Sequence, residues 1–170
     1  TDPAAVHTFS HLSASIVLSR KRASEGLYPA IDPLQSSSKM ATPGTIGERH
    51  YRIAQDVRRT LAQYAELKDI IAMLGLEQLS SEDRKVVARA RRLERFLTQP
   101  FFTTEQFSGI KGKLVSRENA LDGCARILAD EFKDYPEHAL YMIGEVEEAV
   151  EKAKSDKPTG NPTSNPKSEP

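Results

Sequence analysis

The chain has 170 residues, enough for one domain or for a domain with a further fragment. Its 24 lysines and arginines balance 24 aspartates and glutamates, so no net charge draws it toward nucleic acid or a membrane surface. The single cysteine, Cys124, excludes an internal disulfide and a multi-cysteine metal site, and we expect it to be a small core residue.

The first residues carry no initiator methionine and no secretory signal, which indicates that the chain was cut from a longer one. The longest apolar run, residues 70–76, is far shorter than the ~20 residues of a transmembrane helix. We therefore expect a soluble protein of a reducing compartment.

Residues 1–45 have an irregular sequence with one short apolar run, Ile16-Val17-Leu18, which predicts a buried strand. Because a lone strand cannot satisfy its ladder, its neighbours would lie outside this sequence. A short helical turn is expected between Lys21 and Gly26. We expect this region to fray in isolation while the helical part stays folded.

Helical periodicity begins near Glu48 and predicts a helix of roughly 25 residues, capped by Gly75. A second helix is expected from Ser80, with Asp83 completing an approximate capping box and Pro100 ending the helix. The apolar stripe of the first helix comprises Ile53, Val57, Leu61, Tyr64, Leu67, Ile71 and Leu74, and that of the second comprises Val86, Ala90, Leu93, Phe96 and Leu97.

Ser116 is predicted to cap a third helix that carries Leu121, Cys124, Ile127 and Leu128. Pro136 is expected to begin a fourth helix that Gly144 interrupts, and Val146 and Val150 mark a fifth. Helices joined by short connections predict an all-α bundle over residues 46–154. Residues 155–170 are rich in Pro, Ser and Asn and are expected to be a disordered tail.

Two short aromatic clusters lie at breaks between the periodic segments. One contains Tyr28 beside Pro29, and the other contains Phe101 after Pro100, with Phe107 a few residues later. Each aromatic residue alone could belong to the core. Loops carry many binding residues, however, and aromatic faces stack on flat rings, so the clusters indicate a surface for a flat ligand.

The second predicted helix has acidic residues at its start and basic residues in its later turns. This order suits the helix dipole, so a solvated helix explains it, and a tip that contacts a partner protein is the sharper alternative. The tip comprises Glu77, Gln78, Leu79, Ser80, Ser81, Glu82 and Asp83. Glu82, Asp83 and Glu94 interrupt the basic residues of this helix and no aromatic residue lies among them, so we expect no nucleic-acid binding.

No catalytic or metal site is predicted. The segment from Gly109 to Leu114 fails as a phosphate loop, because two residues instead of four separate its glycines and a leucine follows the lysine, so we expect a flexible loop. The four histidines show no metal-ligand spacing, and nothing marks the Glu147-Glu148 pair as an acid and a base.

Several long motifs resemble the catalytic beta subunit of the rotary F-type ATP synthase, in order along the chain as far as residue 154. They are Gly26–Leu34 (GLYPAIDPL), Leu67–Gly75 (LKDIIAMLG), Val87–Phe102 (VARARRLERFLTQPFF), Leu140–Gly144 (LYMIG) and Glu147–Ala153 (EEAVEKA). The resemblance implies a mainly α fold. Residues 1–45 would be the last strand and loop region of a RecA-like α/β nucleotide-binding domain, and residues 46–154 the C-terminal helical bundle.

By this resemblance, Tyr28, Phe101 and Phe107 would bind adenine in a site that takes ATP or ADP with Mg²⁺ in the full-length subunit. The family's phosphate loop and other catalytic residues would lie upstream of Thr1, so this segment alone would be inactive, with no catalytic residue of its own. A free-standing helical interaction module without nucleotide function stays the alternative.

The resemblance also implies partners, namely alpha subunits, a gamma-type central stalk and an epsilon-type regulatory subunit. The tip at residues 77–83 would contact the rotating stalk. The family usually has Asp-Glu-Leu-Ser-Glu-Glu-Asp there, and Gln78 and Ser81 replace two of its glutamates. The protein would be peripheral, without direct membrane insertion, on the cytoplasmic face of an energy-transducing membrane.

Overall fold

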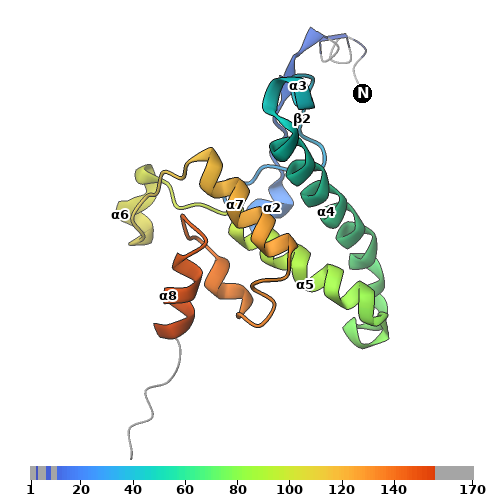
Figure 1. The fold of residues 1–170 in the computed structure, drawn as a ribbon, viewed down its shortest axis with the longest axis vertical. Helices are drawn as coiled ribbons and strands as arrows, with labels where there is room; N and C mark the ends of the chain where they lie inside the picture. The colour runs from blue at the N-terminus through green and yellow to red at the C-terminus, as the bar shows by residue number, and fades with distance from the viewer. Residues whose placement is uncertain (1–2, 4–6, 9–10, 156–170) are drawn as a thin grey trace, which may run out of the picture.

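The computed structural model describes residues 3, 7–8 and 11–155 of the chain (Figure 1). Within that part, no helix has the length and apolar character needed to cross a bilayer. The predicted tail lies outside the described residues apart from Ser155.

Two long helices pack against each other and form a hairpin. Helix α4 (Glu48–Leu74) ends at Gly75, whose φ of 83° is open to glycine at little cost. A single 3₁₀ turn, η1 (Leu76–Gln78), leads to α5 (Ser81–Phe96). The Ser80 side chain accepts the Asp83 N–H at 3.1 Å, so both predicted helices and the predicted cap are confirmed.

The predicted stripe of α5 needs one correction. Val87, rather than Val86, is buried with Ala90, Leu93 and Phe96, while Leu97 follows the last turn and is exposed. The i, i+3, i+6 spacing from Val87 keeps these side chains on the face that meets α4 and α7.

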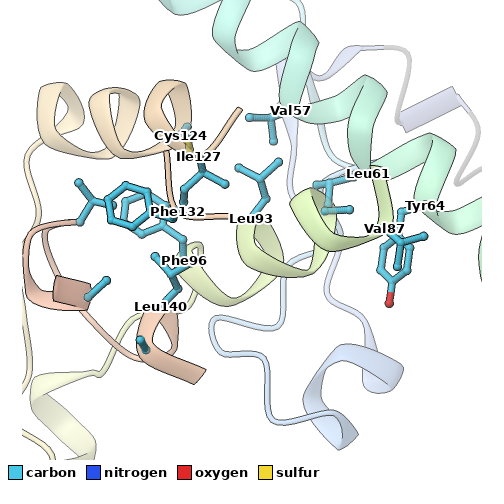
Figure 2. Close-up of a cluster of buried hydrophobic side chains, with 14 of the residues drawn as sticks. Val57, Leu61, Tyr64, Val87, Leu93, Phe96, Cys124, Ile127, Phe132 and Leu140 are labelled. Atoms are coloured by element: carbon cyan, nitrogen blue, oxygen red, sulfur yellow. The ribbon is translucent and has the colours of Figure 1, made fainter. Parts of the chain in front are cut away.

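Helix α7 (Arg117–Leu128) packs against both α4 and α5 (Figure 1). The Ser116 hydroxyl accepts the Asn119 N–H at 3.1 Å, as the sequence predicts. Gly123 allows the close approach, because a Cβ there would lie 2.6 Å from Cε1 of Phe96. Cys124 and Ile127 point into the core beside Leu93 and Phe132 (Figure 2).

The core is one apolar cluster between these helices and the C-terminal segment (Figure 2). Its members are Val57, Leu61, Tyr64, Leu79, Val87, Ala90, Leu93, Phe96, Cys124, Ile127, Phe132, Ala139, Leu140, Ile143, Val146 and Ala149. The mainly α fold class is confirmed.

The fourth predicted helix is wrong beyond its first turn. From Pro136 the chain forms only a 3₁₀ turn, η3 (Glu137–Leu140), before Met142 takes a φ of 53°. The Met142 N–H donates to the Thr98 hydroxyl at 2.9 Å, so a tertiary contact replaces the helical bond. The last helix, α8 (Glu148–Ser155), includes Val150, and Val146 lies in the turn before it.

The buried strand predicted at Ile16-Val17-Leu18 is also wrong. The strand is β1 (Ala14–Ser15), which pairs antiparallel with β2 (Ser37–Ser38), and Leu18 forms an isolated bridge with Ile31. Ile16 and Leu18 are 71% and 74% exposed, because no second layer among the described residues covers this two-stranded ribbon. Helix α2 (Arg20–Ser24), which confirms the predicted turn, lies between the two strands in the sequence, and α3 (Pro43–Ile46) follows β2.

Charged side chains attach this N-terminal segment to the bundle. Arg58 on α4 donates to the carbonyls of Pro33, Leu34 and Ser36 at 2.5–3.0 Å. Glu94 on α5 pairs with Arg22 of α2 at 3.1 Å, and the same oxygen lies 3.5 Å from Nζ of Lys68. Residues 22–36 therefore pack against the hairpin formed by α4 and α5. The expected fraying of residues 1–45 in solution stays a prediction.

Candidate functional site

The two aromatic clusters meet in space. The Gln99 N–H donates to the carbonyl of Tyr28 at 2.8 Å, although the two residues are far apart in sequence. Tyr28 and Phe101 line one cavity of about 320 Å³. The other residues of its wall are Gln99, Pro100, Thr104, Ser108, Ile110 and Met142.

Local backbone geometry presents Tyr28 to the cavity. Gly26 follows α2 with a φ of 75°, which turns the chain, and the Leu27 N–H donates to the carbonyl of Arg22 at 2.9 Å. Leu27 is buried and anchors the turn, whereas Tyr28 is 42% exposed. The tyrosine ring is therefore held by its neighbours and has a face open to a ligand.

The end of α5 leads into the part of the cavity wall that contains Phe101. Because Pro100 cannot continue a helix, the chain leaves α5 extended, and the Lys113 N–H donates to the carbonyl of Pro100 at 3.2 Å. The Gln99 side-chain amide donates to the carbonyl of Lys113. The predicted loop at residues 109–114 is irregular, as expected, and forms the support of this wall.

The structure does not bring Phe107 into the wall. It lies on α6 (Glu105–Ser108), which follows η2 (Phe102–Thr104) away from the bundle, and it is 89% exposed (Figure 1). Its neighbours Thr104, Ser108 and Ile110 do line the cavity. A role for Phe107 in ligand binding stays a prediction.

The cavity is chemically simple. Among the wall residues that the structure describes, none is an Asp, Glu, Lys, Arg or His. Aromatic rings, a proline and a methionine suit a flat apolar ring. Hydroxyl groups on Tyr28, Thr104 and Ser108 add polar atoms to the described wall without adding a group that is charged at neutral pH.

An ion pair stabilises the loop behind the wall. Lys113 donates to Glu148, whose other oxygen accepts the N–H groups of Gly144 and Glu145 at 3.2 Å each. Burial acts to raise the pKa of Glu148, but Lys113 and these N–H groups outweigh it and hold the pKa below its usual value. The carboxylate is ionised at neutral pH and links the loop to α8.

The predicted tip is a second exposed feature, at the turn of the hairpin. Leu79 is buried and anchors it, Asp83 is half-buried, and the exposed residues are Glu77, Gln78, Ser80, Ser81 and Glu82. The Glu82 carboxylate pairs with Lys85 at 2.8 Å. The acidic charge of the tip therefore faces solvent.

Apolar side chains next to the tip are exposed, although the helical periodicity of the sequence did not predict an exposed apolar patch there. Met73 and Leu74 in the last turn of α4 are 75% and 63% exposed, with Ile70 and Leu76 partly exposed beside them. The predicted stripe includes Leu74, but the hairpin ends before α5 can cover this turn. Contiguous apolar groups rimmed by charge are typical of a protein interface.

The arginines of α5 mostly bind within the chain. Arg89 makes a bidentate pair with Asp130, and Arg92 donates to the carbonyls of Phe132, Lys133 and Tyr135. Arg89 and Arg92 therefore hold residues 130–135, which follow α7, against α5.

Comparison with known proteins matches the chain along most of its length. A family model for the C-terminal domain of V and A type ATP synthase matches residues 39–136, and one for the nucleotide-binding domain of the ATP synthase alpha/beta family matches residues 1–38.

Curated relatives give the same result. The chain is 81% identical over 161 residues to ATP synthase subunit beta 1 of Marinomonas sp. (strain MWYL1), covering 93% of this chain and 33% of the relative. It is 83% identical over 158 residues to ATP synthase subunit beta 2 of Albidiferax ferrireducens, covering 93% of this chain and 30% of the relative. The chain therefore spans about a third of the length of these relatives.

Solved structures share the fold. The ATP synthase subunit NeqB from Nanoarcheaum equitans superposes with a TM-score of 0.59 at 26% identity, covering 72% of this chain and 29% of that one. The type III secretion ATPase EscN from enteropathogenic E. coli superposes with a TM-score of 0.58 at 22% identity, covering 75% of this chain and 29% of that one. At this identity the likeness shows the fold alone. The chain belongs to the family of the C-terminal domain of V and A type ATP synthase, and its sequence corresponds to the C-terminal portion of ATP synthase beta subunits.

Proposed function

We propose that this chain supplies the adenine-binding side of a nucleotide site and a hairpin tip that contacts the central stalk of an ATP synthase. Residues 1–45 are the end of the nucleotide-binding domain in this account, and residues 46–154 are the helical bundle. The observation that carries the proposal is the apolar cavity that Tyr28 and Phe101 line together.

The wall chemistry supports a purine base over the phosphates. Stacking on aromatic rings contributes about 1–3 kcal/mol per base, and it needs no charged partner. The cavity of about 320 Å³ lies at the lower end of the range for small-molecule sites and suits the base alone. The phosphates, and the phosphoryl transfer that needs charge stabilisation, belong to residues outside this chain.

Magnesium belongs with the phosphates in this account. Across residues 3, 7–8 and 11–155, no group of three or more His, Cys, Asp or Glu side chains could hold a metal ion. The chain contributes base binding to a site for ATP or ADP with Mg²⁺, and on its own it would not turn ATP over.

Removal of one ring tests the base site in the complete beta subunit assembled in its complex. Phe101→Ala is expected to weaken ADP binding roughly 5- to 150-fold while leaving pyrophosphate binding unchanged. Phe102→Ala is the matched control, because Phe102 is exposed and does not line the cavity. Phe107→Ala in the same series tests the third predicted residue.

Equal ADP affinity for Phe101→Ala and Phe102→Ala would refute the base site. The alternative of a helical interaction module without nucleotide function would then account better for the chain.

The hairpin tip is proposed to meet a gamma-type central stalk and an epsilon-type regulatory subunit, with alpha subunits beside the nucleotide site. The exposed Met73 and Leu74 would add apolar contact to the acidic tip. Such a complex would be peripheral, on the cytoplasmic face of an energy-transducing membrane.

Changing Met73 and Leu74 to serine is expected to weaken stalk binding to the assembled ring, measured by pull-down of the stalk. Leu114→Ser is the control, since Leu114 is 89% exposed but lies far from the tip in the chain. Equal stalk retention in both variants would contradict the contact.

A further inference from the structure

One segment, Tyr141-Met142, contacts the supports of both aromatic clusters. It follows η3 and is at least 40 residues from Phe101 and more than 110 residues from Tyr28 in the sequence. No periodic pattern marks it as part of the cavity, yet Met142 is in the cavity wall.

The Tyr141 hydroxyl holds the turn before Tyr28. It donates to the carbonyl of Gly26 at 2.8 Å, and Gly26 is the residue whose positive φ sets the direction of the chain. The contact is close, because a Cβ on Gly26 would stand 3.4 Å from the same hydroxyl oxygen. The phenol therefore fixes the backbone two residues before the stacking ring.

The backbone of the same segment holds the second cluster. The Met142 N–H donates to the hydroxyl of Thr98, which is 2% exposed and itself donates to the carbonyl of Arg95. Gln99, which follows Thr98 in the chain, donates its N–H to the carbonyl of Tyr28. A continuous chain of contacts thus runs from Tyr141 through the end of α5 back to Tyr28.

The segment is rigid enough to act as a support. Leu140 and Ile143, on either side of it, are buried in the core. The Tyr141 carbonyl accepts a hydrogen bond from Nζ of Lys152 on α8 at 2.8 Å. Rotamers locked by packing and hydrogen bonds keep a binding side chain in its productive position.

We propose that Tyr141 is a positioning residue for the base site, acting through the Gly26 carbonyl to set the ring of Tyr28, and this inference rests on the proposed base site. Tyr141 would not touch the nucleotide. Its hydroxyl reduces the freedom of the Tyr28 turn before the ligand arrives, which lowers the cost of ordering the turn on binding.

Tyr141→Phe tests the inference, since it removes only the hydroxyl. In the complete beta subunit within its complex, we expect ADP binding to weaken roughly 2- to 10-fold, with pyrophosphate binding unchanged. Tyr135→Phe is the matched control, because it makes the same chemical change in a tyrosine that packs against Phe132 with a centroid distance of 5.2 Å, outside the cavity wall.

A double-mutant cycle distinguishes positioning from general stabilisation. In a Tyr28→Ala background, Tyr141→Phe is expected to have no further effect on ADP affinity, because the ring that it positions is gone. The same loss in both backgrounds, or a Tyr141→Phe affinity equal to that of Tyr135→Phe, would overturn the inference. Failure of Tyr28→Ala itself to weaken ADP binding would instead overturn the base site.

Discussion

Gly112 offers a test of how the loop behind Phe101 is built. A Cβ on Gly112 would lie 2.5 Å from Cα and 2.6 Å from Cδ1 of Phe102, and it would also meet the Phe102 backbone nitrogen. Ordinary contacts begin at 3.4 Å, so Gly112→Ala must move the two chain segments apart by about 0.9 Å. Backbone atoms cannot rotate out of the way as a flexible side chain can.

The cost of this movement follows from the contacts that it strains. The bond from the Lys113 N–H to the Pro100 carbonyl is already 3.2 Å long and would break. A lost hydrogen bond costs about 0.5–1.5 kcal/mol and overpacking about 1–3 kcal/mol, so we expect roughly 2–4 kcal/mol of strain. The loop lies outside the core, and local opening will relieve that strain.

Hydrogen exchange followed by mass spectrometry measures this opening. In Gly112→Ala, a peptide spanning residues 109–115 should exchange faster, and ADP binding to the complete subunit should weaken at least tenfold, roughly the effect of 1.4 kcal/mol. Gly44→Ala is the control, because a Cβ at Gly44 meets nothing within 4 Å. Equal protection of the peptide in the two variants would refute the packing argument.

Three further predictions concern charge and burial. Glu94→Ala leaves the cations of Arg22 and Lys68 without their shared carboxylate, which is only 12% exposed. This change should lower the free energy of unfolding by about 3 kcal/mol in thermal unfolding, whereas Glu82→Ala at the solvated tip should change it by less than about 0.5 kcal/mol. Similar losses in the two variants would count against the ion-pair network. The hydrogen bond from Arg89 holds the pKa of Asp130 below its usual value, so this pair stabilises the fold above about pH 4. The difference in unfolding free energy between the native protein and Asp130→Asn should therefore shrink as the pH falls below about 4. A difference that stays constant with pH would contradict the pairing. Burial raises the pKa of the Cys124 thiol to about 12, so a thiol reagent at pH 8 should label it only after denaturation, and rapid labelling of the native protein would show that the site opens.

The sequence predicted the helices whose signals are local. The long apolar period of α4, the glycine after it and the serine before α5 each act within a few residues, and the structure has all three. The resemblance to a known family also predicted that Tyr28 and Phe101 belong to one site, and the structure places both in the wall of one cavity. Sequence spacing alone did not indicate this.

The failures share a tertiary cause. Ile16 and Leu18 have a buried strand's composition, but the described chain has no layer to cover them. The helix expected from Pro136 stops because the Met142 N–H finds Thr98, and no local pattern encodes a partner 44 residues away. The same distance explains why Met142 and Tyr141 were absent from the predicted site.

The central claim is that the ring of Tyr28 stacks on the base of a nucleotide. The most direct measurement is the ADP affinity of the complete subunit in its complex, before and after Tyr28→Ala, with pyrophosphate as the comparison ligand. The account predicts that ADP binding weakens roughly 5- to 150-fold while pyrophosphate binding is unchanged. Unchanged ADP affinity, or an equal loss for both ligands, would contradict it.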